Sequence, residues 1–468
     1  MMMIKKINLN YNNYNIISNN NITFFTFVSF HWHIKNSLTN IIYRRNSHTA
    51  ISKKSQDLDL LCEWFVGFSE AESCFKIKPR YRENKNKIHS FSFEFEIHLH
   101  IDDIDLLKYI YLSLGIGRVY ERKDRKSCSF VVGNEKGIRI LLDIFDRYPF
   151  NGIKKLDYLD FKEAFLAYFN RSGLLSNDLR NKILKLKEGL NTGRMDFTMP
   201  KDHKVKITSY WLLGLIEGEG SFSITRYPLR PRFQLLFTGS QKFLLEEIKN
   251  YLINKLAFDR FSLWILNNSS IIALYEMKAK VNSKPTVSLE IRNIYVLNNY
   301  LNPFLANLKF LSKKGKDFKD FLLICQTLYK GGHKDNKIKD LIVKLSFSMN
   351  DFRLSTYNGN EKQFITQKKI FNIKTAPTMS LVLVDGRVKD LISGKIDHQN
   401  ESSVYQIIKS VEHISTSEEE ILVKTLKEAA NVVGVHYNTL SKKLESLKEF
   451  SYLKINNYLV KRVKIFGG

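Results

Sequence analysis

The sequence contains little cysteine and no long apolar run. Its four cysteines, at positions 62, 74, 128 and 325, show no paired spacing, so they indicate neither a disulfide framework nor a zinc site. A membrane-spanning helix needs about 20 consecutive apolar residues. The apolar stretch at residues 22–32 is shorter than that and includes Ser29 and His31. We therefore expect no membrane span.

Acidic residues are also scarce. The chain has 73 Lys and Arg against 47 Asp and Glu, a formal net charge of +26 over 468 residues. This excess favours a polyanionic partner, above all nucleic acid; the alternative is a basic surface that only aids solubility. The 44% of hydrophobic residues is enough to build the cores of two or three domains.

The N-terminus has no acidic residue at all from position 1 to position 56. It is basic and rich in Asn, which is typical of an organellar import segment or a disordered tail. Residues 1–55 are therefore interpreted as an N-terminal extension. The whole chain is rich in Lys, Asn, Ile, Phe and Tyr, residues with AT-rich codons. We therefore expect a mitochondrial protein, encoded by the organelle.

One segment occurs twice in the chain. WFVGFSEAESCFKI (residues 64–77) and WLLGLIEGEGSFSI (residues 211–224) align without a gap. Three further matches follow in the same order, namely 95–110 with 233–248, the PF, KK and D..DF positions of 149–161 with those of 303–321, and 183–194 with 342–353. These ordered matches predict a tandem duplication, with a first domain at residues 56–200 and a second at residues 201–355.

Each copy has the same predicted elements: a helix, two strands, a helix, two strands and further helices. The strand at residues 90–101 is the clearest, because apolar residues alternate there with Ser, Glu and His. The other elements of the first copy are a helix capped by Asp57, a strand from Cys74, helices at 104–114, 135–145 and 156–169, and a hairpin at 118–132. The fold class is therefore α+β, with two similar domains.

The two motif helices carry small residues on one face and an acid at the end. Gly67 and Ala71 are four residues apart, as are Gly214 and Gly218, so that two helix backbones can approach closely along these faces. Such packing would bring together the final acids, Glu72 and Glu219. A divalent cation would relieve the repulsion between them, and Mg²⁺ binds one or two carboxylates together with water and phosphate. The alternative is ordinary helix packing with solvated glutamates.

FVGFSEAES and LLGLIEGEG resemble the signature of LAGLIDADG homing endonucleases, in the single-chain form with two motifs. The resemblance covers about 300 residues, and it implies an αββαββα fold in each half and a saddle of two antiparallel sheets over the DNA major groove. It also implies a monomer that acts as a pseudo-dimer. By position, Glu72 and Glu219 are the acids that hold Mg²⁺ (or Mn²⁺) at the scissile phosphates.

The family also places a basic residue near each active site. The positions that match are Lys154 and Lys313, although the alignment does not separate them from Lys155 and Lys314. The alternative for these lysines is a plain phosphate contact. The first motif departs from the family at Ser73, where glycine is usual, and this could distort the first site.

The two hairpin surfaces are predicted to read the DNA, because a two-stranded ribbon fits the major groove. Glutamates there could accept hydrogen bonds from cytosine, and histidines could donate. Most basic residues would contact phosphates, and simple solvation is the alternative for each. The predicted contacts are Lys76, Lys78, Arg80, Arg82, Glu94, Glu96, His98, His100, Arg226, Arg230 and Arg232.

The match between the two copies ends at about residue 355. Residues 356–420 are left as a linker of unknown structure. Residues 421–468 resemble the small helix-turn-helix modules that are appended to intron-encoded nucleases, because 425–446 predicts a helix, a turn at Gly434 and a second helix. Tyr437, Asn438 and Lys442 would contact DNA from the second helix. The alternative is a helical pair with no role in DNA binding.

The predicted function is a site-specific, Mg²⁺-dependent endonuclease that cuts both strands of a long asymmetric DNA target. By resemblance, it promotes mobility of its own intron. The alternative is an RNA maturase that helps the host intron RNA to fold and splice, with or without cleavage activity. A non-catalytic DNA-binding regulator is a third possibility, which the two retained acids disfavour.

Overall fold

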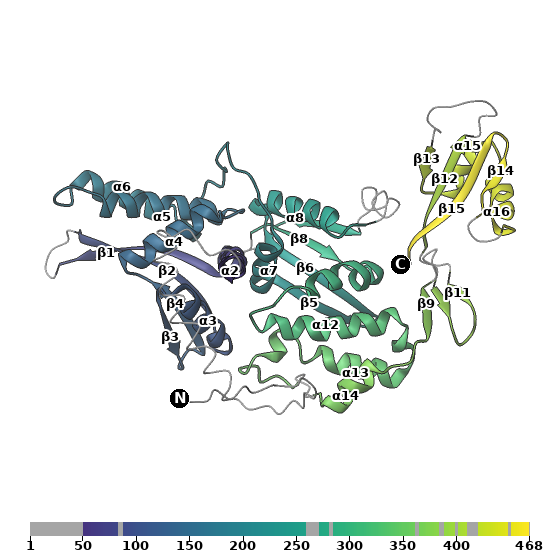
Figure 1. The fold of residues 1–468 in the computed structure, drawn as a ribbon, viewed down its shortest axis with the longest axis horizontal. Coiled ribbons are helices and arrows are strands. Elements are labelled where there is room, and N and C mark those ends of the chain that lie inside the picture. The colour runs from purple at the N-terminus through teal and green to yellow at the C-terminus, as the bar shows by residue number, and fades with distance from the viewer. Residues whose placement is uncertain are drawn as a thin grey trace, which may run out of the picture.

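The structure is a computed structural model that describes residues 50–82, 88–258, 271–279, 284–360, 365–382, 388–397, 401–409, 420–447 and 451–467. Figure 1 shows two domains side by side, with the C-terminal strands set apart from both. Of the predicted N-terminal extension, residues 1–49 lie outside the described residues. The residues from Ala50 onward begin a helix, so the prediction that Asp57 caps this helix is wrong.

The first domain is a four-stranded antiparallel sheet in the order β1-β2-β4-β3 with its helices. A 3-10 turn at Ile101–Asp103 follows β2. The elements are α2 (Ala50–Glu72), β1 (Ser73–Tyr81), β2 (Ile88–His100), α3 (Ile104–Leu114), β3 (Arg118–Arg122), β4 (Ser127–Val132), α4 (Glu135–Arg147), α5 (Lys154–Phe169) and α6 (Asn177–Glu188).

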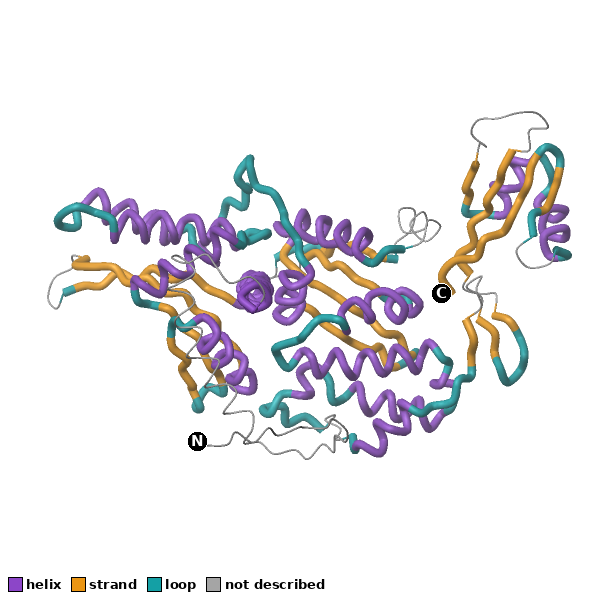
Figure 2. The backbone as a smooth tube through the Cα atoms, in the orientation of Figure 1, coloured by secondary structure: helices purple, strands orange, loops and turns teal. Residues whose placement is uncertain are grey.

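The second domain repeats this order, with a sheet β5-β6-β8-β7 and a 3-10 turn at Gly239–Gln241 after β6. Its elements are α7 (Ser209–Glu219), β5 (Gly220–Arg226), β6 (Leu229–Thr238), α8 (Lys242–Lys255), β7 (Ile272–Met277), β8 (Thr286–Ile291), α10 (Ile294–Val296), α11 (Asn302–Ala306), α12 (Lys314–Tyr329) and α13 (Asn336–Ser346). The predicted α+β duplication is confirmed, and Figure 2 shows the two sets of strands on either side of a central helix pair.

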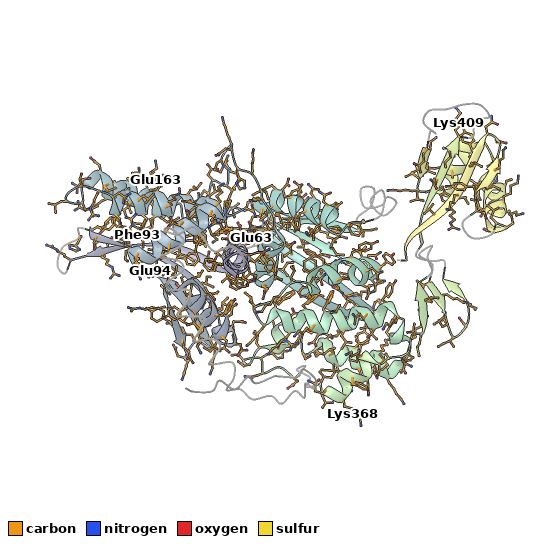
Figure 3. All side chains as sticks on the ribbon, viewed as in Figure 1. Glu63, Phe93, Glu94, Glu163, Lys368 and Lys409 are labelled. Carbon is orange, nitrogen blue, oxygen red and sulfur yellow. The ribbon has the colours of Figure 1, made fainter. Side chains whose placement is uncertain are left out.

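Strand alternation creates one apolar and one polar face on each sheet. Phe93 of β2 is buried and faces the helices, whereas the next residue, Glu94, pairs with Lys78 on the other face (Figure 3). Phe75 and Phe95 extend the apolar face, where each of their rings lies within 6.0 Å of the Phe145 ring of α4. The polar face therefore lies on the side of the sheet away from the helices.

The central pair consists of α2 and α7, whose backbones nearly touch. A Cβ atom at Gly214 would lie 2.7 Å from the backbone N of Phe68 and would overlap the carbonyl of Trp64. A Cβ at Gly67 would likewise overlap the carbonyl oxygen of Trp211. Only glycine permits this approach, so the predicted packing along small-residue faces is confirmed.

A partly buried cluster of ion pairs occurs at the same place in each domain. In the first domain, Arg194 Nε donates to Asp157 Oδ1 at 2.9 Å, and its Nη2 donates to Asp160. Asn191, with a φ of 54°, precedes this arginine and donates through its side chain to the Phe75 carbonyl at 2.8 Å. The second domain makes the same bonds with Arg353, Asp317, Asp320, Asn350 and Phe222. The repeat detected in the sequence thus extends to matching ion pairs.

Residues 356–420, left as a linker by the sequence, contain regular elements. The helix α14 (Gln367–Lys374) packs beside α12 and α13. A three-stranded sheet follows, formed by β9 (Ser380–Val382), β10 (Val388–Asp390) and β11 (Ile396–Asp397). The segment that the sequence left without a structure therefore contains a helix and a small sheet.

The C-terminal module is built on a sheet, not on helices alone. Its strands are β12 (Glu401–Lys409), β13 (Glu420–Val423), β14 (Leu453–Ile455) and β15 (Tyr458–Gly467), in the order β13-β12-β15-β14. The helices α15 (Leu426–Val433) and α16 (Tyr437–Glu445) lie where the sequence predicts them, joined at Gly434 with a φ of 69°. The sheet includes β12, which lies before residue 421, and the sequence analysis had predicted only the two helices.

Candidate active site

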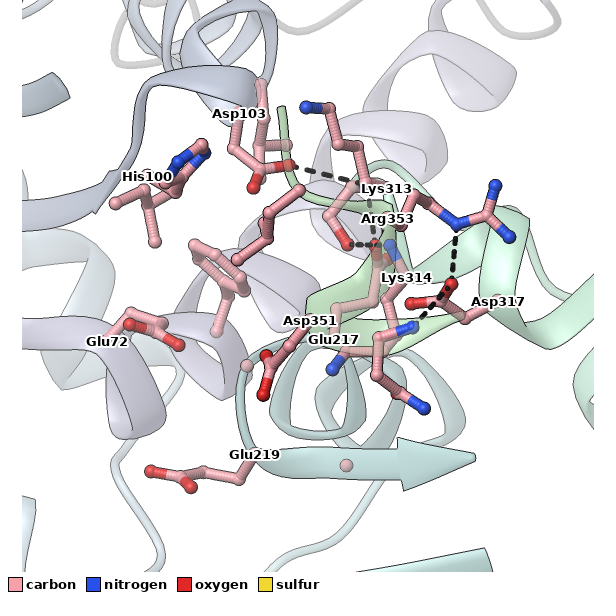
Figure 4. A pocket seen from close by; sticks show the side chains of 18 of the residues that line it. Glu72, His100, Asp103, Glu217, Glu219, Lys313, Lys314, Asp317, Asp351 and Arg353 are labelled. Atoms are coloured by element: carbon pink, nitrogen blue, oxygen red, sulfur yellow. Dashed lines mark hydrogen bonds and ion pairs between the residues drawn. The ribbon is translucent and has the colours of Figure 1, made fainter. Parts of the chain in front are cut away.

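Glu72 and Glu219, the last residues of α2 and α7, line one cleft of about 740 Å³ (Figure 4). Glu72 packs against Gly218, where an added Cβ would lie 3.2 Å from Glu72 Cγ. Burial and then the charge of Glu219 raise the pKa of Glu72 to about 7. The pKa of Glu219 is also raised, because burial outweighs the opposite effect of the nearby lysines 314 and 154. The structure therefore brings the two predicted acids together in a site that destabilises their charges.

The first glutamate of each motif has a different role, which the sequence analysis missed. Glu70 is buried and accepts hydrogen bonds from the backbone N of Asn151 at 2.8 Å and of Gly152 at 2.7 Å. Glu217 is also buried and accepts from the backbone N of residues 311 and 312 at 2.9 and 2.5 Å, and from Trp64 Nε1 at 2.9 Å. Each carboxylate thus fixes the loop before a lysine-bearing helix. The recurrence of this first glutamate in both motifs was the feature of the sequence that could have indicated its role.

The two lysine-bearing helices decide which lysines correspond. Lys154 is the first residue of α5, and Lys314 is the first residue of α12. Lys313 precedes α12 as Ile153 precedes α5, and Lys313 Nζ lies 3.1 Å from Asp102 Oδ2. The equivalent of Lys154 is therefore Lys314, and the assignment of Lys313 as the second basic residue is corrected.

Ser73, the departure from the usual motif, is accommodated without distortion. Its Oγ donates to the carbonyl oxygen of Ser69 at 2.5 Å, so α2 ends at Glu72 just as α7 ends at Glu219. Lys154 Nζ donates to the Ser73 carbonyl at 2.8 Å. Lys155 instead contacts His203, Nζ to Nδ1, at 3.1 Å. Of the first lysine pair, Lys154 therefore lies at the end of the motif helix.

The predicted DNA-contacting residues of the first domain share the polar face of β1 and β2, where much of their charge is already paired. Lys76 pairs with Glu96, and Lys78 with Glu94, so neither carboxylate is free for cytosine within this structure. His98 Nδ1 hydrogen-bonds Ser129 Oγ at 2.8 Å. The remaining members of the face are Arg80 and His100, whereas Arg82 is exposed beyond the end of β1.

In the second domain, strand parity separates the three predicted arginines. Arg230 and Arg232 of β6 lie on the polar face, and Arg232 Nη1 lies 3.8 Å from Glu290 Oε1. Arg226 lies on the helix side instead. Its guanidinium is 3.6 Å from the centre of the Phe347 ring and donates to Ser346 Oγ at 2.9 Å. The prediction that Arg226 contacts DNA is therefore wrong, because its side chain packs against the end of α13.

The residues predicted in the C-terminal module lie together on α16. Tyr437, Asn438 and Lys442 are exposed at its surface, and Leu440 on the same helix is fully buried. Leu440 faces the apolar core of the module, which it shares with α15. Asn438 and Lys442 therefore lie on the opposite side of α16, whereas Tyr437 lies beside the buried side.

The comparisons with known proteins agree with this geometry. The sequence model of the family described as LAGLIDADG endonuclease matches residues 65–165 and 212–325, which contain both motif helices and both lysine-bearing helices. The two duplicated domains belong to the LAGLIDADG endonuclease family.

Two fungal relatives show where such chains occur. The "Probable intron-encoded endonuclease Cox1-I1b" of Schizosaccharomyces pombe is 27% identical over 228 residues, which is 47% of this chain and 58% of the relative. The "Uncharacterized mitochondrial protein RF1" of Saccharomyces cerevisiae is 28% identical over 357 residues, 74% of this chain and 71% of the relative. The first match thus spans little more than half of that relative.

Solved structures of LAGLIDADG homing endonucleases share the fold. One is I-GzeII in complex with its DNA target, with a TM-score of 0.53 and 22% identity over 62% of this chain and 99% of that chain. Another is I-SmaMI bound to an uncleaved DNA target in the presence of calcium ions. Its TM-score is 0.51, with 20% identity over 62% of this chain and 98% of that chain. Among the described residues here, no helix has the length and apolar character to cross a bilayer.

Proposed function

We propose that this protein is a site-specific DNA endonuclease that hydrolyses one phosphodiester bond in each strand of a long asymmetric target. The observation that carries the proposal is the meeting of Glu72 and Glu219 in one cleft, below two polar sheet faces and beside Lys154 and Lys314. Two non-identical halves in one chain suit an asymmetric target, because no symmetric partner is needed.

The donor set of the cleft fits a divalent cation. Glu72 and Glu219 supply anionic oxygen ligands, and their partial burial leaves their charges poorly solvated. No group of three or more His, Cys, Asp or Glu side chains with metal-binding geometry occurs in the described parts of the chain. Most of the coordination shell would therefore come from water and phosphate, which is the preference of Mg²⁺ and is also compatible with Mn²⁺. Bound there, the cation would polarise a phosphoryl oxygen and activate water.

The protein side chains would orient the DNA and stabilise charge. The polar sheet faces would hold the duplex, mainly through phosphate contacts. Lys154 and Lys314, at the first positions of their helices, would stabilise negative charge on the phosphate that is cut. Glu70 and Glu217 would act as positioning residues, because they fix the loops that precede these lysines.

The expected setting is a mitochondrial intron. The relatives from S. pombe and S. cerevisiae are named as intron-encoded and as mitochondrial, respectively. We propose that this chain is likewise made in mitochondria and promotes the mobility of its own intron. Cutting the intronless allele would start that process.

The test is cleavage of a randomised duplex library by the purified full chain. With Mg²⁺, the protein should release products that share one long sequence, whereas chelation by EDTA should stop the reaction. Substitution of Mn²⁺ for Mg²⁺ should retain it. If the library stays intact in both metals, the nuclease proposal is wrong. Tight binding of host intron RNA in that case would favour the maturase interpretation.

We also propose that the C-terminal module extends the DNA footprint through α16. Replacing Lys442 by Ala should weaken target binding about fivefold and lower the salt dependence of binding by about one phosphate contact. The cleavage rate at saturating DNA should not change, because α16 is not part of the cleft. Both quantities follow from binding and single-turnover assays at several salt concentrations.

Lys368→Ala provides the matched control for this prediction. Lys368 is exposed on α14, on the far side of the second domain from the module (Figure 3). Lys368→Ala removes the same charge as Lys442→Ala. Because it lies away from α16, it should leave target affinity nearly unchanged. Equal losses for the two variants would show a non-specific charge effect and would contradict a DNA contact by α16.

A further inference from the structure

A turn of the first domain is bonded to the lysine loop of the second. Asp102 lies in the 3-10 turn after β2, and its Oδ2 is 3.1 Å from Lys313 Nζ and accepts a hydrogen bond from Ser355 N at 2.8 Å. The next residue, Asp103, accepts from the backbone N of Lys313 at 3.4 Å (Figure 4). We call these four residues the cross-domain clamp.

Lys313, one of the clamp residues, directly precedes the first residue of α12. The lysine proposed to act on DNA, Lys314, therefore follows a residue that is held through both its backbone and its side chain. The side chains of the ion pair are largely shielded, with 15% of Asp102 and 31% of Lys313 exposed. A shielded carboxylate with two donors from another domain restrains a loop better than an exposed ion pair does.

Among the described residues, the other half has no ion pair equivalent to Asp102–Lys313, although Gln241, the counterpart of Asp103, lies against the first lysine loop, where a Cβ on Gly152 would be 2.6 Å from its Oε1. In the alignment of 95–110 with 233–248, Asp102 corresponds to Ser240, whose Oγ bonds Thr238 Oγ1 of its own domain at 3.0 Å. Lys313 corresponds to Ile153, which carries no charge. The two lysine loops are therefore supported by different means.

The first lysine loop is held by the segment that joins the domains. Asn151 is fully buried, and its side chain accepts from Lys206 N at 2.7 Å and donates to Lys206 O at 3.0 Å. His203 Nε2 bonds the Asn151 carbonyl at 2.9 Å. Loss of the clamp would leave all three of these bonds in place.

We propose that Asp102 is a positioning residue for Lys314, so that cutting of one DNA strand depends on Asp102 and cutting of the other does not. This inference rests on the proposed nuclease function. It assigns to the turn of the first domain a role in the chemistry of the second half-site. It also assigns to Lys313 a structural role in place of a catalytic one.

The experiment compares Asp102→Ala with Ser240→Ala, its counterpart in the other domain, in the full chain. The probe is the target duplex selected from the randomised library, with a different fluorophore on each strand. Asp102→Ala should slow one strand about tenfold to a hundredfold, since small misplacements have such effects, and nicked duplex should accumulate. Ser240→Ala should cut both strands at the wild-type rate. Equal slowing of both strands, or no slowing, overturns the proposal.

A second variant and a second readout make the result independent of folding and of catalysis. Lys313→Gln should reproduce the strand-selective loss, and the double variant should be no slower than the slower single variant. Additive losses would count against the clamp.

By hydrogen exchange, amides at 311–315 should exchange about tenfold faster in Asp102→Ala, and those at 151–155 should exchange at the wild-type rate. Unchanged exchange at 311–315 overturns the positioning role. A wild-type protein that cuts neither strand overturns the nuclease function alone, because exchange still tests the clamp.

Discussion

Replacing either Glu72 or Glu219 by Gln is expected to abolish double-strand cleavage, with the affected reaction slowed at least about a thousandfold. Glutamine has the same shape as glutamate but no negative charge, so the cleft loses half of its anionic metal ligands. The double variant should be inactive on both strands. The measurement is single-turnover cleavage of the selected target in Mg²⁺, with each strand followed separately.

Binding and folding should survive these substitutions. The two carboxylates repel each other in the metal-free protein, so removing one charge should not lower the thermal unfolding temperature and should retain target affinity. Glu63→Gln is the matched control, because Glu63 lies on the same helix and accepts from Thr208 Oγ1 at 2.7 Å, away from the cleft. Activity that persists in both cleft variants would contradict the whole assignment of the site.

The helix pair and its acids were predictable because both depend on short-range spacing. Gly67 and Gly214, with Glu72 and Glu219, recur at fixed distances along one helix, and a duplicated pattern is independent of loop lengths. The correct lysine pair was also predictable, although the prediction named Lys313. Asp157 matches Asp317 at an offset of 160 residues (317 − 157), which places Lys154 opposite Lys314, and the starts of α5 and α12 agree.

The packing of Arg226 and the C-terminal strands could also have been predicted from the sequence. Phe222 and Ile224 of β5 point into the core, so the same parity places Arg226 on that side, where its long side chain stacks on Phe347. The C-terminal residues 453–463 contain apolar and β-branched residues that favour strands, on both sides of an Asn-Asn turn at which Asn456 has a φ of 51°.

The cross-domain bonds are a different case, because no local pattern announces them. Asp102 and Lys313 are far apart in sequence, and nothing in the spacing of either residue points to the other. The same holds for Trp64, whose indole N–H bonds Glu217 of the second motif. Such contacts follow from how the two copies are docked, and docking is fixed by the glycine faces of α2 and α7.

Gly214→Ala is therefore expected to cause a large loss of stability. The new Cβ would overlap the carbonyl of Trp64 and lie 2.7 Å from Phe68 N. Both are backbone atoms of a packed helix, and they cannot rotate away as a side chain could. Overpacking of this kind costs about 3 kcal/mol or more of the free energy of unfolding. Denaturant titration should show the loss, and cleavage of both strands should fall with it.

Gly189→Ala separates this effect from the general cost of replacing a glycine. Gly189 has a φ of −77° at the end of α6, and an added Cβ there would meet its nearest neighbour, Asp160 Oδ2, at 3.4 Å. That is ordinary van der Waals contact, so this variant should unfold within about 0.5 kcal/mol of wild type. If the two alanine variants unfold at the same denaturant concentration, α2 and α7 are not packed in this register. The meeting of the two acids would then lose its structural basis, because the close approach of the glycine faces is what brings the ends of both helices into one cleft.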